Sequence, residues 1–368
     1  MVINTKSKLN ILFAAGGTGG HLFPAIAVAE QLQKLTDNNV NLVFIGTNDR
    51  IESKIIPELG FEYHTMPITG FAGISLQSMA LPWRVFKSVL KSRAVLKVHE
   101  IDALICAGAY ISYPPGVAAH QLGIPFYIME SNVNLGKTNE KLAPNANLIF
   151  TSFTESEDYI NEEDKDKIRN YGNPIRNFLL NLPDKDDALA SFELEPNKRT
   201  VLIVGGSLGA RSINIAVEKS LFELAKLDFQ FIWQTGKNFV APANLPNNVK
   251  QTQFINDMAS AYSAADLVVS RSGATAVAEI CVAGKPSILV PMPSASNNEQ
   301  YFNAKAMEDA KAAVLVEDSK IGEEFLSVMV DLAKDNAKLN QLSQAVRVLA
   351  KPDAAERVAK EILNSLGW

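Results

Sequence analysis

The sequence predicts an α/β protein built from two Rossmann-like domains, and three observations lead to this prediction. Short apolar runs alternate with helix-length amphipathic stretches along the chain, which is typical of parallel sheets covered by helices. A unit of strand, glycine loop and helix occurs twice, once near the start and once near residue 205. The chain has 368 residues, which favours two domains over one.

The first half of the chain contains the elements of one such domain. They are a strand at Leu9–Ala14, a helix at Leu22–Leu35 and strands at Val40–Ile45, Ala103–Cys106, Pro125–Met129 and Leu148–Thr151. Continuous apolar runs of this length are expected for parallel strands that are buried on both faces. A charge-rich stretch, Glu155 to Arg169, then leads into Gly172-Asn173-Pro174. We place the domain boundary just after it, so that residues 1–176 form the N-terminal lobe.

The pattern starts again in a C-terminal lobe of residues 177–351. Its predicted elements are a strand at Thr200–Val204, a helix at Arg211–Ala225 and strands at Phe229–Gln234, Val249–Gln253, Leu267–Ser270 and Ser287–Pro291. The final stretch, Asp353–Leu366, has the amphipathic pattern of a helix that begins after Pro352. We expect this helix, within residues 352–368, to pack back on the N-terminal lobe.

Composition and charge exclude several classes of protein. With 47% hydrophobic and 20% charged residues the chain is of ordinary globular type, and its net charge of −5 argues against general nucleic-acid binding. Cys106 and Cys281 lack the spacing of a metal or redox motif, which favours buried thiols in a reducing compartment. The uncharged stretch 103–129 is interrupted by glycines and prolines, so it is not predicted to span a membrane. We therefore expect a cytoplasmic protein with, at most, peripheral membrane contact.

Two glycine loops, Ala15–His21 and Gly205–Ala210, each follow a strand and precede a helix. Glycine lets the backbone approach a ligand closely, and the N–H groups at the start of a helix favour an anion. Ser207 adds a hydroxyl suited to a phosphate oxygen. Either loop alone fits a tight turn without a ligand equally well, but their matching positions favour phosphate binding. Neither loop is a P-loop, and no acidic residue ends the second strand as in dinucleotide-binding domains, because Ile45-Gly46-Thr47 stands there.

Eight motifs, taken in order, resemble one enzyme family. They are Gly16-Gly17-Thr18-Gly19-Gly20-His21, Tyr110-Ile111-Ser112, Glu130-Ser131-Asn132, Gly172-Asn173-Pro174-Ile175-Arg176, Gly205-Gly206-Ser207-Leu208-Gly209-Ala210, Phe254-Ile255-Asn256-Asp257-Met258, Ser270-Arg271-Ser272-Gly273-Ala274 with Glu279, and Gln300 with Asn303-Ala304. Together they cover nearly the whole chain. On these residues the chain resembles the bacterial UDP-N-acetylglucosamine: lipid I N-acetylglucosaminyltransferases.

The resemblance implies a GT-B fold, in which two Rossmann-like domains face each other across a cleft. It implies inverting transfer of N-acetylglucosamine from UDP-N-acetylglucosamine to the muramyl 4-hydroxyl of a polyprenyl-diphosphate-linked muramyl pentapeptide, in peptidoglycan synthesis. The enzyme would act at the cytoplasmic face of the bacterial inner membrane, with other cell-wall synthesis proteins as possible partners.

The resemblance also assigns roles to individual residues. Ile255 would hold the uracil by its backbone, and Glu279 would accept hydrogen bonds from the ribose hydroxyls. Ser207 and Arg176 would hold the diphosphate, while Asn132 and Gln300 would contact the sugar. The complete set of implied donor-binding residues is Gly17, Thr18, Gly19, Asn132, Arg176, Ser207, Ile255, Ala274, Thr275, Glu279, Glu299 and Gln300.

Several of these residues also have a simpler interpretation. Glu279 could be a solvated helix carboxylate, Arg176 a member of a surface ion pair, and Asn132 a turn residue before Gly136. Glu299 stands where the family has a neutral residue or a histidine. A further carboxylate near a diphosphate is unfavourable unless it bonds hydroxyls.

No Asp-x-Asp pair stands at a strand end where it could hold a metal ion on the diphosphate, so neither a metal nor another cofactor is predicted. The charge of departing UDP is then expected to be met by helix N-termini, Ser207 and Arg176. His21 is the candidate general base, because a neutral imidazole can take a proton from the acceptor hydroxyl. Its alternative roles are a helix cap or a ligand of an acceptor phosphate.

The stretch from Tyr63 to His99 has no acidic residue and five basic ones, interleaved with apolar and aromatic side chains. A basic, aromatic-containing amphipathic segment in an acidic protein suits an anionic membrane surface. The predicted membrane contacts are Ile74, Leu76, Met79, Trp83, Phe86 and Lys87. An ordinary packed helix with a solvated basic face is the alternative.

Three other functions fit parts of the pattern. The first is a related transferase that places a sugar on diacylglycerol, and the second is a UDP-N-acetylglucosamine 2-epimerase with the same two-lobed fold. The third is a non-catalytic subunit that binds a nucleotide sugar and recruits a partner enzyme.

Overall fold

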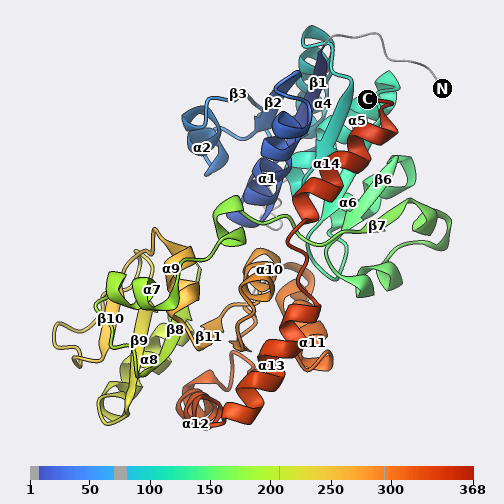
Figure 1. The fold of residues 1–368 in the computed structure, drawn as a ribbon. Coiled ribbons are helices and arrows are strands. Elements are labelled where there is room, and N and C mark those ends of the chain that lie inside the picture. The colour runs from blue at the N-terminus through green and yellow to red at the C-terminus, as the bar shows by residue number, and fades with distance from the viewer. Residues whose placement is uncertain (1–7, 70–80, 207, 294) are drawn as a thin grey trace. The chain divides into compact units, whose positions relative to one another are not determined.

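The computed structural model describes residues 8–69, 81–206, 208–293 and 295–368 (Figure 1). The chain divides into two compact units, the first made of Met1–Ile175 with Asp353–Trp368 and the second of Arg176–Pro352. Each unit contains one sheet whose strand pairs are parallel. The predicted fold class, α/β with two Rossmann-like domains, is confirmed.

The first unit is built on a seven-stranded sheet with the order β3-β2-β1-β4-β5-β6-β7. Its strands are β1 (Leu9–Ala14), β2 (Val40–Gly46), β3 (Glu62–Thr65), β4 (Ala103–Cys106), β5 (Phe126–Glu130), β6 (Leu148–Thr151) and β7 (Ile168–Asn170). Its α-helices are α1 (Gly19–Leu35), α2 (Glu52–Glu58), α4 (Leu81–Val98), α5 (Tyr113–Leu122), α6 (Lys137–Leu142) and α14 (Ala354–Ser365). Short 3₁₀ turns occur at Tyr110–Ser112, Ala143–Asn145, Thr154–Tyr159 and Glu162–Lys167.

Successive side chains of β1 enter two different cores, because side chains alternate between the faces of a strand. Ile11 and Phe13 belong to a cluster that α1 and α14 complete, whereas Leu12 belongs to a cluster on the opposite face with residues of α4 and α5. This two-sided burial explains why the strands are continuous apolar runs. The last helix, α14, lies beside α1 in the first unit (Figure 1), and the Tyr127 hydroxyl donates to Ser365 Oγ at 3.0 Å.

The second unit has a six-stranded sheet with the order β10-β9-β8-β11-β12-β13. Its strands are β8 (Arg199–Val204), β9 (Phe229–Gln234), β10 (Val249–Thr252), β11 (Leu267–Ser270), β12 (Ser287–Leu289) and β13 (Val314–Leu315). Its α-helices are α7 (Lys185–Ser191), α8 (Arg211–Leu224), α9 (Met258–Ala264), α10 (Ala274–Ala283), α11 (Glu299–Asp309), α12 (Ile321–Lys334) and α13 (Asn336–Val348), with 3₁₀ turns at Asn177–Leu180 and Ser296–Asn298. Val201 and Ile203 of β8 share a core with residues of α8, α12 and α13.

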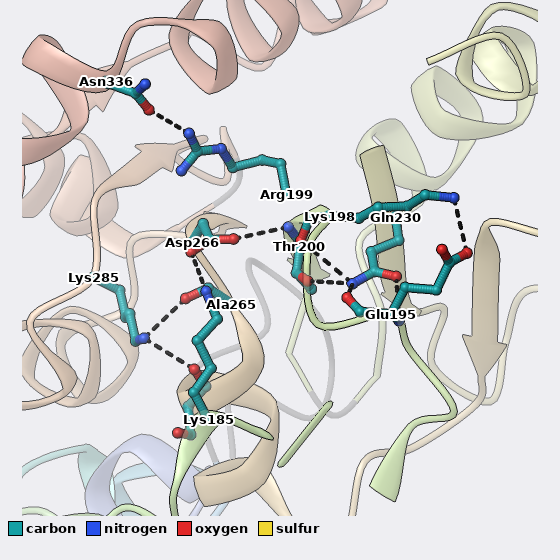
Figure 2. Close-up of polar contacts among 11 residues, drawn as sticks. Lys185, Glu195, Lys198, Arg199, Thr200, Gln230, Ala265, Asp266, Lys285 and Asn336 are labelled. Carbon is teal, nitrogen blue, oxygen red and sulfur yellow. Dashed lines mark hydrogen bonds and ion pairs between the residues drawn. The ribbon is translucent and has the colours of Figure 1, made fainter. Parts of the chain in front are cut away.

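A polar network joins the amino-terminal ends of three strands of the second sheet (Figure 2). The Asp266 carboxylate accepts a hydrogen bond from the Thr200 N–H at 2.9 Å and forms an ion pair with Lys185 Nζ at 2.5 Å. The buried Gln230 amide donates to Thr200 Oγ1 and to the Glu195 carbonyl, at 2.9 and 2.8 Å. The network lies at the opposite end of β8 from the glycine loop, so its contribution is to stability.

Lys285 lies beside this network (Figure 2), where its ammonium donates to the carbonyls of Ala265 and Ser263 at 2.8 and 3.2 Å. Burial lowers the pKa of Lys285 from 10.5 to about 8. Between these pH values the unfolded chain keeps a proton that the native protein has released, so the free energy of unfolding rises with pH. We expect Lys285 to contribute a rise of about 3 kcal/mol across this window.

Urea unfolding at a series of pH values measures this rise. Lys285→Met should remove it, whereas Lys219→Met, at an exposed position of α8, should leave it in place. Identical pH profiles for the wild type and Lys285→Met would contradict the assignment.

None of the helices in the described part of the chain is both long enough and apolar enough to cross a membrane.

Candidate active site

The strand order places a ligand-binding position in each unit. In open α/β sheets, ligands bind outside the carboxyl ends of the strands, where the strand order reverses. This reversal falls between β1 and β4 in the first sheet and between β8 and β11 in the second. The two glycine loops follow β1 and β8, so each lies at the reversal point of its own sheet.

The first glycine loop rests on a buried carboxylate that the sequence patterns did not single out. Glu52, 0% exposed, accepts hydrogen bonds from the Gly17 N–H at 2.9 Å and from the N–H and hydroxyl of Thr47 at 3.1 and 2.8 Å. Gly16 has φ +146°, and a Cβ there would lie 2.3 Å from the Glu52 carboxyl carbon. The Gly17 N–H is therefore directed at Glu52, and any ligand contact of Gly17 depends on close approach of its backbone.

His21, in the first turn of α1, reaches across to the end of β4. Its Nδ1 lies 3.0 Å from the Ala107 carbonyl oxygen, which can only accept, so Nδ1 carries the proton and Nε2 keeps its lone pair. Burial lowers the pKa of the imidazole below 6.5, and the nearby Glu130 carboxylate offsets part of this effect. Gly108 has φ +97°, and a Cβ there would lie 2.8 Å from Nδ1. These contacts favour a neutral imidazole in one tautomer, and its Nδ1 contacts the Ala107 carbonyl rather than the start of α1.

Glu130 organises the loop that follows β5. It is 3% exposed and accepts hydrogen bonds from the N–H groups of Asn132 and Gly136, at 3.0 and 2.9 Å, and from the Asn139 amide at 2.7 Å. The carbonyl of Asn132 accepts from Ser156 Oγ at 3.1 Å. Asn132 thus has a structural role in this loop. Its predicted sugar contact stays a prediction.

The second glycine loop packs closely against the end of β9. A Cβ on Gly209, which has φ +81°, would lie 2.0 Å from the Thr235 carbonyl oxygen, so this approach requires glycine. The Gln234 amide donates to the Gly206 carbonyl at 2.9 Å and accepts from the Ile255 N–H at 2.8 Å. Gln234 therefore connects the loop to the segment predicted to bind uracil. Ser207, the predicted hydroxyl donor, lies outside the described residues.

Because the Ile255 N–H is bonded to Gln234, the carbonyl of Ile255 is the backbone group suited to a ligand. Ile255 lines a cavity of about 270 Å³ in the second unit, together with Phe192, Lys250, Phe254 and Asp257. Asp257 caps α9 through the Ser260 N–H at 3.0 Å.

Glu279 and Arg176 lie together in the second unit. Arg176 donates from Nε and Nη2 to Glu279 Oε1 at 3.2 and 2.9 Å, and the Tyr262 hydroxyl donates to Oε2 at 3.3 Å. Glu279 is 5% exposed, so the solvated-carboxylate interpretation is wrong. Burial raises the pKa of Glu279, and Arg176 and Tyr262 offset part of the rise. Arg176 is in an ion pair, as one alternative proposed, but its partner lies 103 positions away in sequence.

The start of α10 is one position in the described part of the second unit that suits an anion. Gly273 is its N-cap and provides no side-chain cap, and the first helical residues are Ala274 and Thr275. The N–H groups of a helix's first turn and the helix dipole favour negative charge there. Gln300, near the start of α11, accepts from the Met292 N–H at 3.0 Å. Glu299 is the first residue of α11, where a carboxylate interacts favourably with the helix dipole.

The basic stretch from Tyr63 to His99 is described at residues 63–69 and 81–99. Ile74, Leu76 and Met79 lie outside the described residues. In α4, Trp83, Phe86 and Leu90 are 59%, 50% and 50% exposed, and their spacing places them on one face of the helix. The Trp83 and Phe86 rings stack at 5.6 Å, and Lys87 Nζ lies 5.3 Å from the centre of the Trp83 ring.

Comparison with known proteins gives a consistent result. Residues 11–151 match the Glycosyltransferase family 28 N-terminal domain, and residues 200–358 match the Glycosyltransferase family 28 C-terminal domain. A protein of Bacteroides thetaiotaomicron is 37% identical over 98% of both chains, and one of Phocaeicola vulgatus is 37% identical over 98% of this chain and 97% of its own. Both are named UDP-N-acetylglucosamine–N-acetylmuramyl-(pentapeptide) pyrophosphoryl-undecaprenol N-acetylglucosamine transferase.

Among solved structures, the chain resembles the crystal structure of Acinetobacter baumannii MurG, with a TM-score of 0.77, 28% sequence identity and coverage of 97% of this chain and 99% of the other. Domain matches, full-length sequence identity and fold agree. The chain belongs to glycosyltransferase family 28 and, within it, to the MurG family of N-acetylglucosamine transferases.

Proposed function

We infer that the protein transfers N-acetylglucosamine from UDP-N-acetylglucosamine to the muramyl 4-hydroxyl of undecaprenyl-diphosphate-linked muramyl pentapeptide, with inversion at the sugar. The observation that carries this inference is the 37% identity across 98% of both chains to a relative named for that reaction. The two glycine loops at the reversal points of the two sheets support it. No observation favours the diacylglycerol transferase, the epimerase or the non-catalytic subunit.

In the proposed donor site, the second unit binds the UDP moiety. The Ile255 carbonyl accepts the uracil N3–H, because the N–H of the same residue is bonded to Gln234. Glu279 accepts hydrogen bonds from the ribose hydroxyls, and the adjacent Arg176 favours its ionised form. The diphosphate lies at the start of α10, near Ala274 and Thr275, where backbone N–H groups favour its charge.

In the proposed reaction, His21 Nε2 takes the proton of the muramyl 4-hydroxyl as that oxygen forms a bond to the anomeric carbon. The bond from the anomeric carbon to the β-phosphate oxygen breaks, and its electron pair leaves with UDP. Arg176 and the first turn of α10 stabilise the charge of the leaving group. Gln300, Asn132, Glu299 and the Thr18–Gly19 loop are the proposed contacts of the sugar and the reacting centre.

One experiment tests the proposed activity. The protein is incubated with radiolabelled UDP-N-acetylglucosamine and with lipid I, diacylglycerol or no acceptor, and the label is followed. We expect label in lipid II only when lipid I is present. Label in a diacylglycerol product, in free epimerised sugar nucleotide, or in no product would each reject the proposal.

We also propose that α4 contacts an anionic membrane surface at the cytoplasmic face of the inner membrane. Its exposed Trp83, Phe86 and Leu90 form an apolar face, and Lys87 and Lys91 are also exposed. Aromatic rings next to lysines are suited to the headgroup region of anionic lipids. This contact would bring the enzyme to its polyprenyl-linked acceptor.

We expect Trp83→Ser/Phe86→Ser to weaken binding to vesicles containing anionic lipid by about 10-fold or more, because two exposed rings no longer enter the interface. Flotation or sedimentation with vesicles measures the partition. Phe222→Ser is the matched control, since Phe222 in the second unit is 70% exposed and the centre of its ring lies 3.6 Å from Lys226 Nζ. Unchanged vesicle binding by the double variant would refute the contact.

A further inference from the structure

A cluster of three metal-binding side chains lies at the edge of the first sheet, apart from the groups assigned to glycosyl transfer. Glu62 and His64 belong to the edge strand β3, and His99 directly follows α4. Residues two apart on a strand point to the same face, which places Glu62 and His64 side by side. The sequence could not indicate this cluster, because His99 is 35 positions from His64.

The ligand atoms of the cluster form a small triangle. The Nε2 atoms of His64 and His99 are 2.9 Å apart, and Glu62 Oε1 lies 3.1 Å from the first and 3.4 Å from the second. A point equidistant from all three atoms in their plane is only about 1.8 Å from each. An ion with bonds of about 2.0–2.1 Å to nitrogen and oxygen would therefore be within bonding distance of all three atoms when it lies just above their plane.

The chemistry of the ligand set favours a transition metal over calcium or magnesium. Two imidazoles and one carboxylate suit zinc and neighbouring first-row ions, whereas calcium and magnesium prefer oxygen ligands. The side chains of Glu62, His64 and His99 are 49%, 29% and 16% exposed, so an ion can enter from solvent and keep water in the remaining positions.

We propose that Glu62, His64 and His99 form a surface site for a divalent first-row transition-metal ion such as Zn²⁺, which ties the edge strand β3 to the end of α4. The bound ion would connect the two ends of the segment 65–98. That segment includes the exposed aromatic face of α4. The site takes no part in the transfer reaction, and the proposal does not depend on the proposed activity.

The histidine content of the chain allows a clean test. The protein has four histidines, of which His120 is exposed on α5 and can serve as a control. The two cysteines, Cys106 and Cys281, are buried, so native thiols do not compete for the ion.

Full-length protein freed of metal with a chelator is titrated with Zn²⁺ against a chromophoric competitor. We expect one equivalent to bind to the wild type and to His120→Asn. His64→Asn and His99→Asn should each weaken that binding by at least the roughly 10–100-fold that follows loss of an outer-shell partner. Equal zinc affinity in all four proteins, or no stoichiometric binding to the wild type, would overturn the proposal.

Thermal unfolding provides a second measurement. Zn²⁺ should raise the Tm of the wild type and of His120→Asn, because an ion that binds only the folded state stabilises it. It should not raise the Tm of His64→Asn or His99→Asn. A variant whose metal-free Tm matches the wild type is folded, so two histidine variants keep the test valid if one of them fails to fold. A zinc-dependent rise in Tm that survives in both variants would place the ion elsewhere and reject the site.

Discussion

His21→Gln is expected to lower kcat by about 10²- to 10⁴-fold, the usual contribution of a positioned general base, with UDP affinity unchanged. Glutamine can donate to the Ala107 carbonyl as His21 Nδ1 does, so the ring's anchoring contact is retained while the proton acceptor is lost. The groups proposed to bind UDP all belong to the second unit, which explains why UDP affinity should not change.

Single-turnover rates and UDP titrations of the wild type and His21→Gln measure this difference. His120→Gln controls for loss of an exposed histidine. If His21→Gln has the same kcat as the wild type, His21 is not the general base and another residue must accept the proton.

The pH dependence of the rate provides an independent check. Because burial lowers the pKa of His21 below 6.5, the acid limb of the kcat/KM profile should lie below pH 6.5. The same residue makes the native protein less stable in acid, since the unfolded chain binds the imidazole proton at a higher pH than the folded one. Both effects should be absent from His21→Gln.

Glu279→Ala is expected to raise the Kd for UDP by about 10- to 100-fold, the range for loss of hydrogen bonds to a charged group. The variant removes the proposed acceptor for the ribose hydroxyls and leaves Arg176 and Tyr262 without the partner that they share. Calorimetric titration with UDP measures the change. Tyr262→Phe is the matched control, because it removes one hydrogen bond to Glu279 but keeps a ring in the buried position.

The comparison of the two variants separates binding from stability. If Glu279 has only a structural role in the fold, Glu279→Ala will lower the Tm while the Kd for UDP stays at the wild-type value, and the ribose contact will be rejected. If Glu279 contacts ribose, the Kd for UDP rises in Glu279→Ala and changes little in Tyr262→Phe.

The paired strands and glycine loops could be predicted because their signals are local. A buried parallel strand is a continuous apolar run, and a close turn into a helix needs glycine, as at Gly16 and Gly209. The short edge strands β3, β7 and β13 were not predicted. Their residues are only partly buried, so they lack the apolar run that marks an inner strand.

The residues of the candidate site could be predicted from the sequence, but their hydrogen-bond partners could not. Resemblance to the family pointed to Ile255 and Glu279, whereas His21 was chosen for its residue type and its position beside the first glycine loop. The partners of these residues come from distant parts of the chain: Ala107 for His21, Gln234 for Ile255, and Arg176 for Glu279. No spacing rule connects residues that far apart.

The sequence by itself thus determined the α/β class and the repeated strand–glycine loop–helix unit, because local periodicity indicates both. It also determined the membership of a transferase family, because the motifs of that family occur in order along the chain. Only the tertiary structure decided which donors and acceptors remain available to a ligand. It directs the Gly17 N–H at Glu52 and the Ile255 N–H at Gln234, and it holds His21 with Nε2 unprotonated. The physical reason is that a hydrogen bond depends on distance and direction in space, which chain folding sets independently of separation in sequence.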